Sequence, residues 1–297
     1  RKTLLDFPLS EVREYIDWTP FFIAWEFKGK YPKIFKDETV GKEAKKVFEE
    51  AQKLLDEIIS KKLIKANAVF GIFSANSVDD DIEIYADNKG ANPLATIHTI
   101  RQQGNKSSKF SNLALSDFVA PKGTNKKDYV GAFAVTTGIG VQELVDKYEK
   151  DDDDYNAIMV KVIADRLAEA FTELLHKKLR TDYWGYSKEE KFDNDDLIKE
   201  KYIGIRPAPG YPAQPDHTEK EILFSLLDVE KNIGLTLTES YAMYPTASVS
   251  GFYFANPNAK YFNVGKISKD QVEDYTKRKN MNLSEIEKWL APILSYK

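Results

Sequence analysis

Two long segments carry apolar side chains at helical spacing. Between residues 40 and 59, apolar residues recur three or four positions apart, and Lys and Glu fill most of the positions between them. This period predicts an amphipathic helix. A second apolar stripe runs from Tyr155 to Leu175. The acidic run Asp151–Asp154 precedes it and the basic end begins at His176, so the charges at both ends suit the dipole of a long helix.

Short β-prone runs follow the first of these helices. The segments Ala68–Phe73, Ile82–Tyr85 and Leu94–Ile100 are separated by residues that include Asn, Asp and Gly. This pattern predicts consecutive antiparallel strands. Tyr129–Thr136 is predicted to be another strand, ending at Thr137 and Gly138.

Turn and capping signals organise the last third of the chain. Three segments, starting at Thr218, Ser268 and Ser284, have the spacing of a capping box and predict the starts of three helices. The β-prone segments Ala247–Phe254 and Tyr261–Ile267 flank an Ala-Asn-Pro-Asn turn, so we expect them to form a hairpin.

The strands cluster along the sequence and do not alternate regularly with helices. That order favours an α+β fold over a doubly wound parallel sheet. The chain has 297 residues, enough for a sizeable core. We interpret it as one compact unit, in which residues 1–38 are a lead-in packed on a main domain of residues 39–297. Because the chain starts with Arg1 and not Met, we expect it to be a part of a longer protein.

Composition narrows the classes of function. The net charge is −4, which argues against a nucleic-acid partner because phosphate binding usually needs a basic surface. The chain has no cysteine, so disulfides, thiolate metal sites and cysteine nucleophiles are excluded. The three histidines (His98, His176 and His217) are scattered, so no metal site is predicted. No apolar run is long enough to span a bilayer, and no membrane partner is predicted.

The segment from Arg206 to His217 is the most informative for chemistry. It holds four prolines and Gly210, which exclude a helix or a central strand and stiffen the loop. A rigid surface connector is the alternative interpretation. The presence of Arg206, Tyr211 and His217 on so stiff a frame favours a binding loop.

Two N-terminal features are weaker signals. Asp17 lies in an aromatic-rich segment that ends at Phe22, and an aromatic anchor in the core is the more common use of such a segment. The lysines at positions 28, 30, 33 and 36 suit a docking patch for an acidic protein, or a solvated loop. The sequence offers no convincing nucleophile–base pair, so no catalytic residue is predicted.

The motif Arg206-Pro207-Ala208-Pro209-Gly210-Tyr211-Pro212 resembles the signature of the activation domain of cobalamin-dependent methionine synthase. Further segments along the chain, in the same order, resemble that family. They include Asp17–Phe22, Asp80–Tyr85, Asp117–Lys122, Tyr129–Val135, Ala164–Phe171, Tyr183–Tyr186, Leu237–Ser240, Ala247–Gly251 and Trp289–Pro292. The resemblance therefore covers essentially the whole chain.

The resemblance implies a C-shaped α+β domain around a twisted antiparallel sheet flanked by helices. It implies the C-terminal module of a large cytoplasmic methyltransferase, so the fragment alone is not a complete enzyme. Such a module binds S-adenosylmethionine and supplies its methyl group for the reductive methylation of inactive cob(II)alamin to methylcobalamin. The implied partners are the cobalamin-binding domain of the same polypeptide and flavodoxin or an equivalent reductase.

The resemblance also implies a set of ligand contacts. The implied S-adenosylmethionine site comprises Asp17, Arg206, Ala208, Tyr211, His217, Tyr261 and Phe262. The chemistry is reasonable: a guanidinium suits the ligand carboxylate, a carboxylate suits its ammonium, and aromatic rings suit adenine and the sulfonium. The alternative is a non-catalytic regulatory domain that binds the ligand or flavodoxin. An independent methyltransferase of the doubly wound type is disfavoured, because its glycine-rich turn is missing.

Overall fold

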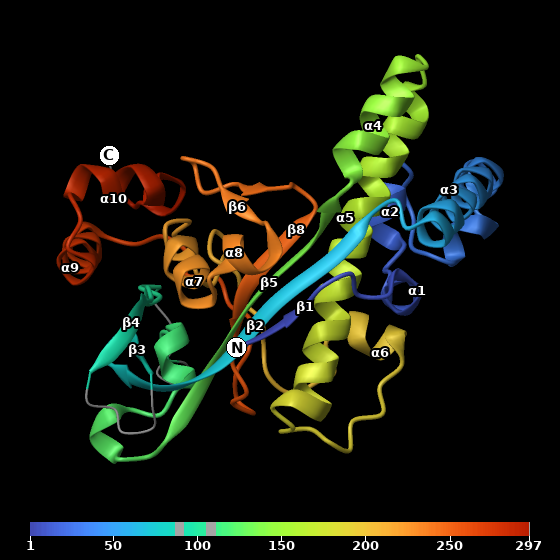
Figure 1. Cartoon of the computed structure of the whole chain (residues 1–297). Coiled ribbons are helices and arrows are strands. Elements are labelled where there is room, and N and C mark those ends of the chain that lie inside the picture. Colours follow the sequence, from blue (N-terminus) through green and yellow to red (C-terminus); the bar gives the residue numbers. More distant parts are fainter. Residues whose placement is uncertain (87–91, 105–110, 297) are drawn as a thin grey trace.

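A long antiparallel sheet forms the centre of the protein (Figure 1). The computed structural model describes residues 1–86, 92–104 and 111–296. The strands of this sheet are β1 (Lys2–Leu4), β2 (Lys65–Val78), β3 (Asp81–Tyr85), β4 (Pro93–His98), β5 (Asp128–Ile139) and β8 (Ser248–Tyr253). A separate two-stranded ribbon consists of β6 (Thr236–Leu237) and β7 (Met243–Tyr244).

The strand order in the large sheet is β4-β3-β2-β5-β8, and every pairing is antiparallel. Strand β2 is the spine of this sheet, since β5 pairs along nearly its whole length. On its other edge, β1 pairs with residues 68–70 and β3 pairs with residues 74–78. The N-terminal residues are thus part of the central sheet.

Helices cover both faces of the sheet (Figure 1). The α-helices are α1 (Leu9–Val12), α2 (Thr19–Ala24), α3 (Gly41–Lys61), α4 (Val141–Lys150), α5 (Asp154–Lys178), α6 (Asn194–Ile198), α7 (Glu219–Leu227), α8 (Val229–Ile233), α9 (Lys269–Lys279) and α10 (Leu283–Leu290). Single 3-10 turns occupy Arg13–Tyr15, Lys33–Lys36, Leu115–Phe118, Lys122–Thr124 and Ala291–Ile293, and a π-helical turn (Leu179–Tyr183) extends α5.

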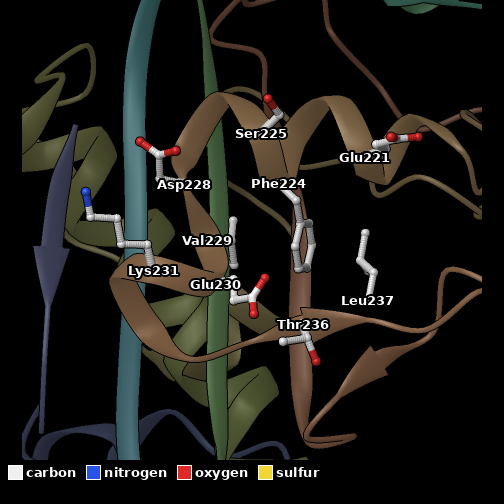
Figure 2. A pocket seen from close by; sticks show the side chains of 9 residues that line it. All are labelled: Glu221, Phe224, Ser225, Asp228, Val229, Glu230, Lys231, Thr236 and Leu237. Atoms are coloured by element: carbon white, nitrogen blue, oxygen red, sulfur yellow. The ribbon is translucent and has the colours of Figure 1, made fainter.

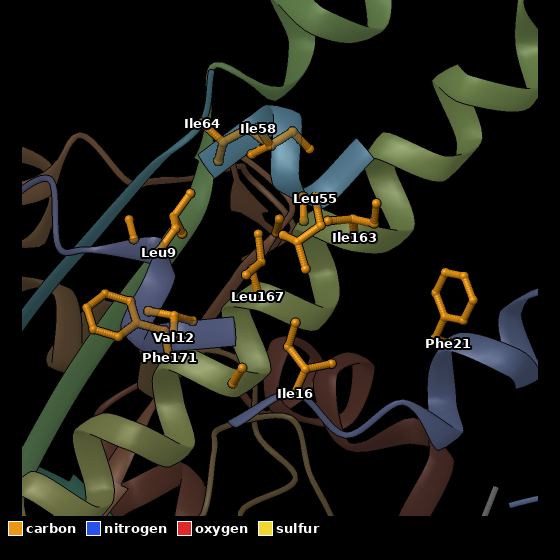
Figure 3. Close-up of a cluster of buried hydrophobic side chains, with 14 of the residues drawn as sticks. Leu9, Val12, Ile16, Phe21, Leu55, Ile58, Ile64, Ile163, Leu167 and Phe171 are labelled. Carbon is orange, nitrogen blue, oxygen red and sulfur yellow. The ribbon is translucent and has the colours of Figure 1, made fainter. Parts of the chain in front are cut away.

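The alternation of side chains along the strands divides the core into two layers. On β5, Phe133 and Val135 face a cluster built on α1, α2, α3 and α5, whereas Ala132 and Ala134 face a cluster built on α7 and α8. Figure 3 shows part of the first cluster, in which Leu55 of α3 lies near Ile163 of α5. Two buried faces of one sheet explain why β5 carries no polar side chain from Val130 to Val135.

The structure confirms the α+β class and the antiparallel sheet. The helix predicted over residues 40–59 is α3, and the second predicted helix is α5. The four strands predicted before residue 140 are β2, β3, β4 and β5. Residues 1–38 contribute to the same core as α3 and α5, and a boundary between residues 38 and 39 stays a prediction. Among the described residues, no helix is both long and apolar enough to cross a membrane.

The predicted hairpin after β8 is wrong, because Tyr261–Ile267 is not a strand. The available edge of β8 is taken by the segment that leads into the proline-rich loop: the N–H of Phe252 donates to the carbonyl of Pro207, at 2.9 Å. The 261–267 segment bonds elsewhere, since the N–H of Val264 donates to the carbonyl of Pro212, also at 2.9 Å.

The three predicted capping boxes are wrong in detail, although each lies at the start of a helix. Thr218 precedes α7 but its side chain caps nothing; Asp216 accepts from its N–H and its hydroxyl, both at 2.8 Å. Ser268 precedes α9 without capping it, and its hydroxyl contacts Gln103 at 2.9 Å. Helix α10 begins at Leu283, so Ser284 is already inside it.

Candidate functional site

The proline-rich loop is fixed to the sheet at its start and closed on itself at its centre. Ile205 pairs with Phe254 just beyond β8, which places Arg206 beside the sheet edge. Farther along, the N–H of Gly210 donates to the carbonyl of Gln214 at 2.7 Å, and the N–H of Gln214 donates to the carbonyl of Tyr211 at 2.9 Å. Together with the fixed φ angles of the prolines, these bonds give the loop one shape.

Gly210 lets the loop fold back onto His217. Its φ is +93°, a left-handed conformation, and a Cβ atom there would overlap the imidazole of His217. The ring therefore packs directly on the glycine backbone. Its Nδ1 accepts from Nζ of Lys220, at 3.0 Å. Burial, with the charge of Lys220, lowers the pKa of His217.

Six of the seven predicted site residues line one cavity of about 450 Å³. They are Arg206, Ala208, Tyr211, His217, Tyr261 and Phe262. The volume lies in the range typical of sites for small organic ligands. The rest of the lining comes from the loop itself, from β8, from Phe133 of β5 and from Glu169 and Thr172 of α5, with Lys220 and Met243.

The seventh residue, Asp17, lies in a neighbouring cavity of about 270 Å³. Arg206 and Glu169 line both cavities, so the two spaces meet at these side chains. One carboxylate oxygen of Asp17 accepts from the N–H of Thr19 at 2.9 Å, at the start of α2. Asp17 thus combines the structural turn that its sequence suggests with a place at a cavity wall.

The aromatic members of the set have different positions. The hydroxyl of Tyr261 accepts from the backbone N–H of Arg206 at 3.0 Å, and burial raises the pKa of Tyr261. Phe262 packs against Phe118, with ring centroids 6.3 Å apart. Tyr211 is 63% exposed, so its ring stands at the rim of the cavity.

The guanidinium of Arg206 is held by residues that the sequence did not identify. Its Nη2 donates to Glu173 at 2.7 Å, and its Nη1 donates to Tyr202 at 2.6 Å and to His176 at 3.1 Å. Glu173 and His176 are one helical turn apart on α5, and this spacing was the only signal in the sequence that they share a face. Nothing in the sequence pairs either of them with the loop.

A third, shallower cavity of about 770 Å³ lies between α7, α8 and β6 (Figure 2). Its wall carries the carboxylates of Glu221, Asp228 and Glu230 and none of the predicted site residues. Within the described ranges, no group of three or more His, Asp or Glu side chains is placed to hold a metal ion. The cavity at Arg206 is therefore the better candidate for a functional site.

Comparisons with known proteins agree with this choice of family. Residues 8–280 match the family model described as the vitamin B12-dependent methionine synthase activation domain. The chain is also similar to a crystal structure of the MetH reactivation domain bound to AdoHcy. The sequence identity is 52%, the TM-score is 0.97, and the match covers 100% of this chain and 91% of the other. The chain belongs to the family of activation domains of vitamin B12-dependent methionine synthases.

Proposed function

We propose that the cavity at Arg206 binds S-adenosylmethionine and that the domain supplies the ligand's methyl group to cobalamin. The cobalamin is carried by another domain of the same polypeptide, so this chain is one part of a methyltransferase. The observation that carries the proposal is the position of Arg206 between two cavities, one largely apolar and one lined with carboxylates. An amino-acid nucleoside matches this pair of cavities, because it has a flat nucleoside part and a charged amino-acid part.

The amino-acid end of the ligand fits the boundary between the cavities. Its carboxylate would meet Arg206, since a guanidinium donates charge-assisted hydrogen bonds to such a group. Its ammonium would lie toward the smaller cavity, where Asp17 and Glu169 supply negative charge. Asp17 has one carboxylate oxygen committed to Thr19, which leaves the other for the ligand.

The nucleoside end fits the larger cavity. Its adenine and sulfonium would lie among Tyr211, Tyr261 and Phe262, because aromatic faces attract both flat bases and cations. Ala208 would leave room beside the loop backbone, and His217 would form part of the wall. The hydrogen bond from the backbone N–H of Arg206 to the hydroxyl of Tyr261 fixes the nucleoside part of the site relative to the amino-acid part.

For methyl transfer from a sulfonium, the protein has to position the methyl group and does not have to supply an acid or a base. The sulfonium is already a good leaving group, and the acceptor supplies the electron pair once flavodoxin or an equivalent reductase has provided one electron. The contribution of this chain is to hold the methyl group toward the opening of the cavity. We therefore assign no general base among the lining residues, and we propose a cytoplasmic setting for this reaction.

Calorimetric titration of an Arg206→Ala variant tests the proposal. We expect affinity for S-adenosylmethionine to fall by about 1.5–3 kcal/mol, the range for hydrogen bonds to charged groups. Methionine and adenosine serve as ligand controls, since each carries one end of the molecule. Unchanged affinity in a variant with native thermal unfolding would remove Arg206 from the site and overturn the proposed binding mode.

We also propose that a lysine patch docks the acidic reductase. We define this patch as Lys28, Lys30, Lys33 and Lys36; all four are exposed and none has an ion-pair partner in the described part of the chain. Beside them, Ile23 is 63% exposed, so the surface has an apolar element too. Unpaired cations around an apolar contact are suited to steering and seating an anionic protein.

A further inference from the structure

Three side chains that do not line the larger cavity hold the guanidinium of Arg206. Nη1 donates to the hydroxyl of Tyr202 at 2.6 Å and to Nδ1 of His176 at 3.1 Å, and Nη2 donates to Oε2 of Glu173 at 2.7 Å. Glu173 and His176 come from the long helix α5, which packs on the sheet. These bonds fix the plane of the guanidinium as well as its position.

The contact with Arg206 determines the tautomer of His176. An arginine only donates hydrogen bonds, so Nδ1 of His176 must accept through its lone pair. In a neutral imidazole the proton is then on Nε2, which lies 3.4 Å from the hydroxyl of Tyr186. That hydroxyl in turn donates to the carbonyl of Ile203, at 3.4 Å. One chain of donors and acceptors therefore runs from Arg206 through the imidazole to the backbone.

The surroundings of His176 keep its ring neutral. The side chain is fully buried, and its ring stacks on Tyr253 with centroids 4.9 Å apart. The groups that face it are the guanidinium groups of Arg206 and Arg180 and the hydroxyl-bearing rings of Tyr186, Tyr202 and Tyr253. Burial, together with the two arginines, holds the pKa of His176 well below its ordinary value.

The pattern of contacts leaves a defined part of the guanidinium unused. Of its five N–H groups, Tyr202 and His176 take both on Nη1, and Glu173 takes one on Nη2. Within residues 1–86, 92–104 and 111–296, no acceptor meets Nε–H or the second N–H of Nη2. Nε and Nη2 flank one edge of the plane, and their two unused N–H groups are the ones from which a ligand carboxylate can still accept.

We propose that His176, as its Nε2–H tautomer, is a positioning residue that occupies Nη1 of Arg206 together with Tyr202 and so turns the Nε/Nη2 edge toward the carboxylate of the bound amino-acid nucleoside. This inference rests on the proposed function. It assigns a role to a buried residue that contacts no ligand itself. The role requires an acceptor at the position of Nδ1 and nothing else from the imidazole.

Two substitutions and two ligands test this role. In His176→Leu the acceptor is lost, whereas in His176→Asn the side-chain oxygen replaces Nδ1. S-adenosylhomocysteine carries the amino-acid end, and 5′-methylthioadenosine has the same nucleoside without it. We expect His176→Leu to weaken binding of S-adenosylhomocysteine about tenfold while the affinity for 5′-methylthioadenosine stays nearly unchanged. His176→Asn should restore most of the lost affinity.

A matched control separates positioning from loss of stability. Leu175 is a buried neighbour on α5, so Leu175→Ala destabilises the core without removing an acceptor from Arg206. If His176→Leu lowers both affinities equally, as a general loosening would, the inference is wrong. The inference is also wrong if His176→Asn loses as much affinity as His176→Leu. It is wrong, too, if Arg206→Ala abolishes the preference for S-adenosylhomocysteine over 5′-methylthioadenosine and His176→Leu leaves that preference intact. If Arg206→Ala itself has no effect, the proposed function fails first.

The tautomer has a readout that needs no ligand. Nitrogen NMR of the histidine-labelled protein distinguishes protonated from unprotonated ring nitrogens, and a His176→Asn spectrum assigns the resonances. We expect Nδ1 of His176 to be unprotonated and Nε2 to be protonated at neutral pH. A proton on Nδ1, or a doubly protonated ring, would contradict the hydrogen-bond pattern on which the inference depends.

Discussion

At the scale of single residues, the site depends on Gly210, because the absence of a side chain there leaves room for the ring of a neighbouring residue. The imidazole of His217 occupies the volume that a side chain at Gly210 would need, and the loop turns there through a left-handed φ. The motif therefore requires glycine for two reasons, backbone conformation and contact with His217. These two reasons can be separated, because Gly234 has a left-handed φ of +71° and a Cβ atom added there would meet no other atom within 4 Å.

We predict that Gly210→Ala destabilises the protein by about 1–3 kcal/mol and weakens ligand binding. The added methyl group must displace His217 as well as strain the backbone. Gly234→Ala carries the backbone strain alone and should cost about 1 kcal/mol with no effect on binding. Urea unfolding and calorimetric titration of both variants measure the difference. Equal effects of the two substitutions would show that the contact with His217 is unimportant.

The sequence identified the residues that line the cavities far better than the residues that support them. Arg206 and Tyr211 belong to an unusual motif, so their chemistry stands out in the sequence. Glu173 and His176 lie on an ordinary amphipathic helix, 33 and 30 residues before Arg206, and only the folded chain brings them together. Support of this kind depends on tertiary contacts that no local pattern encodes.

At the scale of elements, a buried charge cluster joins α7 to α9. Nζ of Lys279, at the end of α9, donates to Asp216 at 2.8 Å and to Thr218 and Glu219 at 2.6 Å. Both carboxylates are fully buried. Burial raises the pKa of Asp216, but the charge and hydrogen bond of Lys279 outweigh it and the net pKa is lowered. The cluster fixes the chain between His217 and the start of α7.

We predict that Lys279→Met destabilises the protein by about 3–5 kcal/mol, since it leaves two carboxylates buried without their cation. Lys277→Met is the control: Lys277 is exposed on the same helix and has no ion-pair partner in the described ranges. Thermal unfolding at neutral pH checks both. A melting temperature for Lys279→Met equal to that of the control would mean that the cluster contributes little.

Long periodic elements could be predicted, and short or paired ones could not. Helices α3 and α5 have clear apolar stripes over 21 and 25 residues, so their patterns were decisive. No local pattern indicated that Pro207, and not Tyr261–Ile267, pairs with β8. A proline carbonyl accepts a sheet hydrogen bond as well as any other, whereas composition suggests that a proline-rich segment avoids sheets.

At the scale of the whole molecule, the proline-rich loop is anchored on the sheet, and helix α5 provides Glu173 and His176, which hold Arg206. The two helical layers bury both sheet faces, so Arg206 and the residues behind it are set on rigid elements (Figure 1). The lysine patch belongs to the N-terminal segment that packs on the α5 side. The cavity at Arg206 and the basic surface are thus formed by different residues of the domain.

We predict that charge reversal in the patch slows reductive activation of the full-length methionine synthase that carries this domain. Lys30→Glu with Lys33→Glu should reduce the rate about tenfold at low ionic strength and much less at high salt, because salt screens the attraction. Lys126→Glu with Lys127→Glu makes the same charge change at another exposed site. If both double variants lose activity equally, docking at the patch is ruled out.

The central claim is that the cavity at Arg206 holds an amino-acid nucleoside, and a crystal structure of this chain with S-adenosylhomocysteine tests it most directly. The account predicts density in the cavity of about 450 Å³, with the ligand carboxylate on the Nε/Nη2 edge of Arg206 and the adenine beside Tyr261. Density elsewhere, such as in the cavity beside α8, or an empty cavity at saturating ligand, would contradict it.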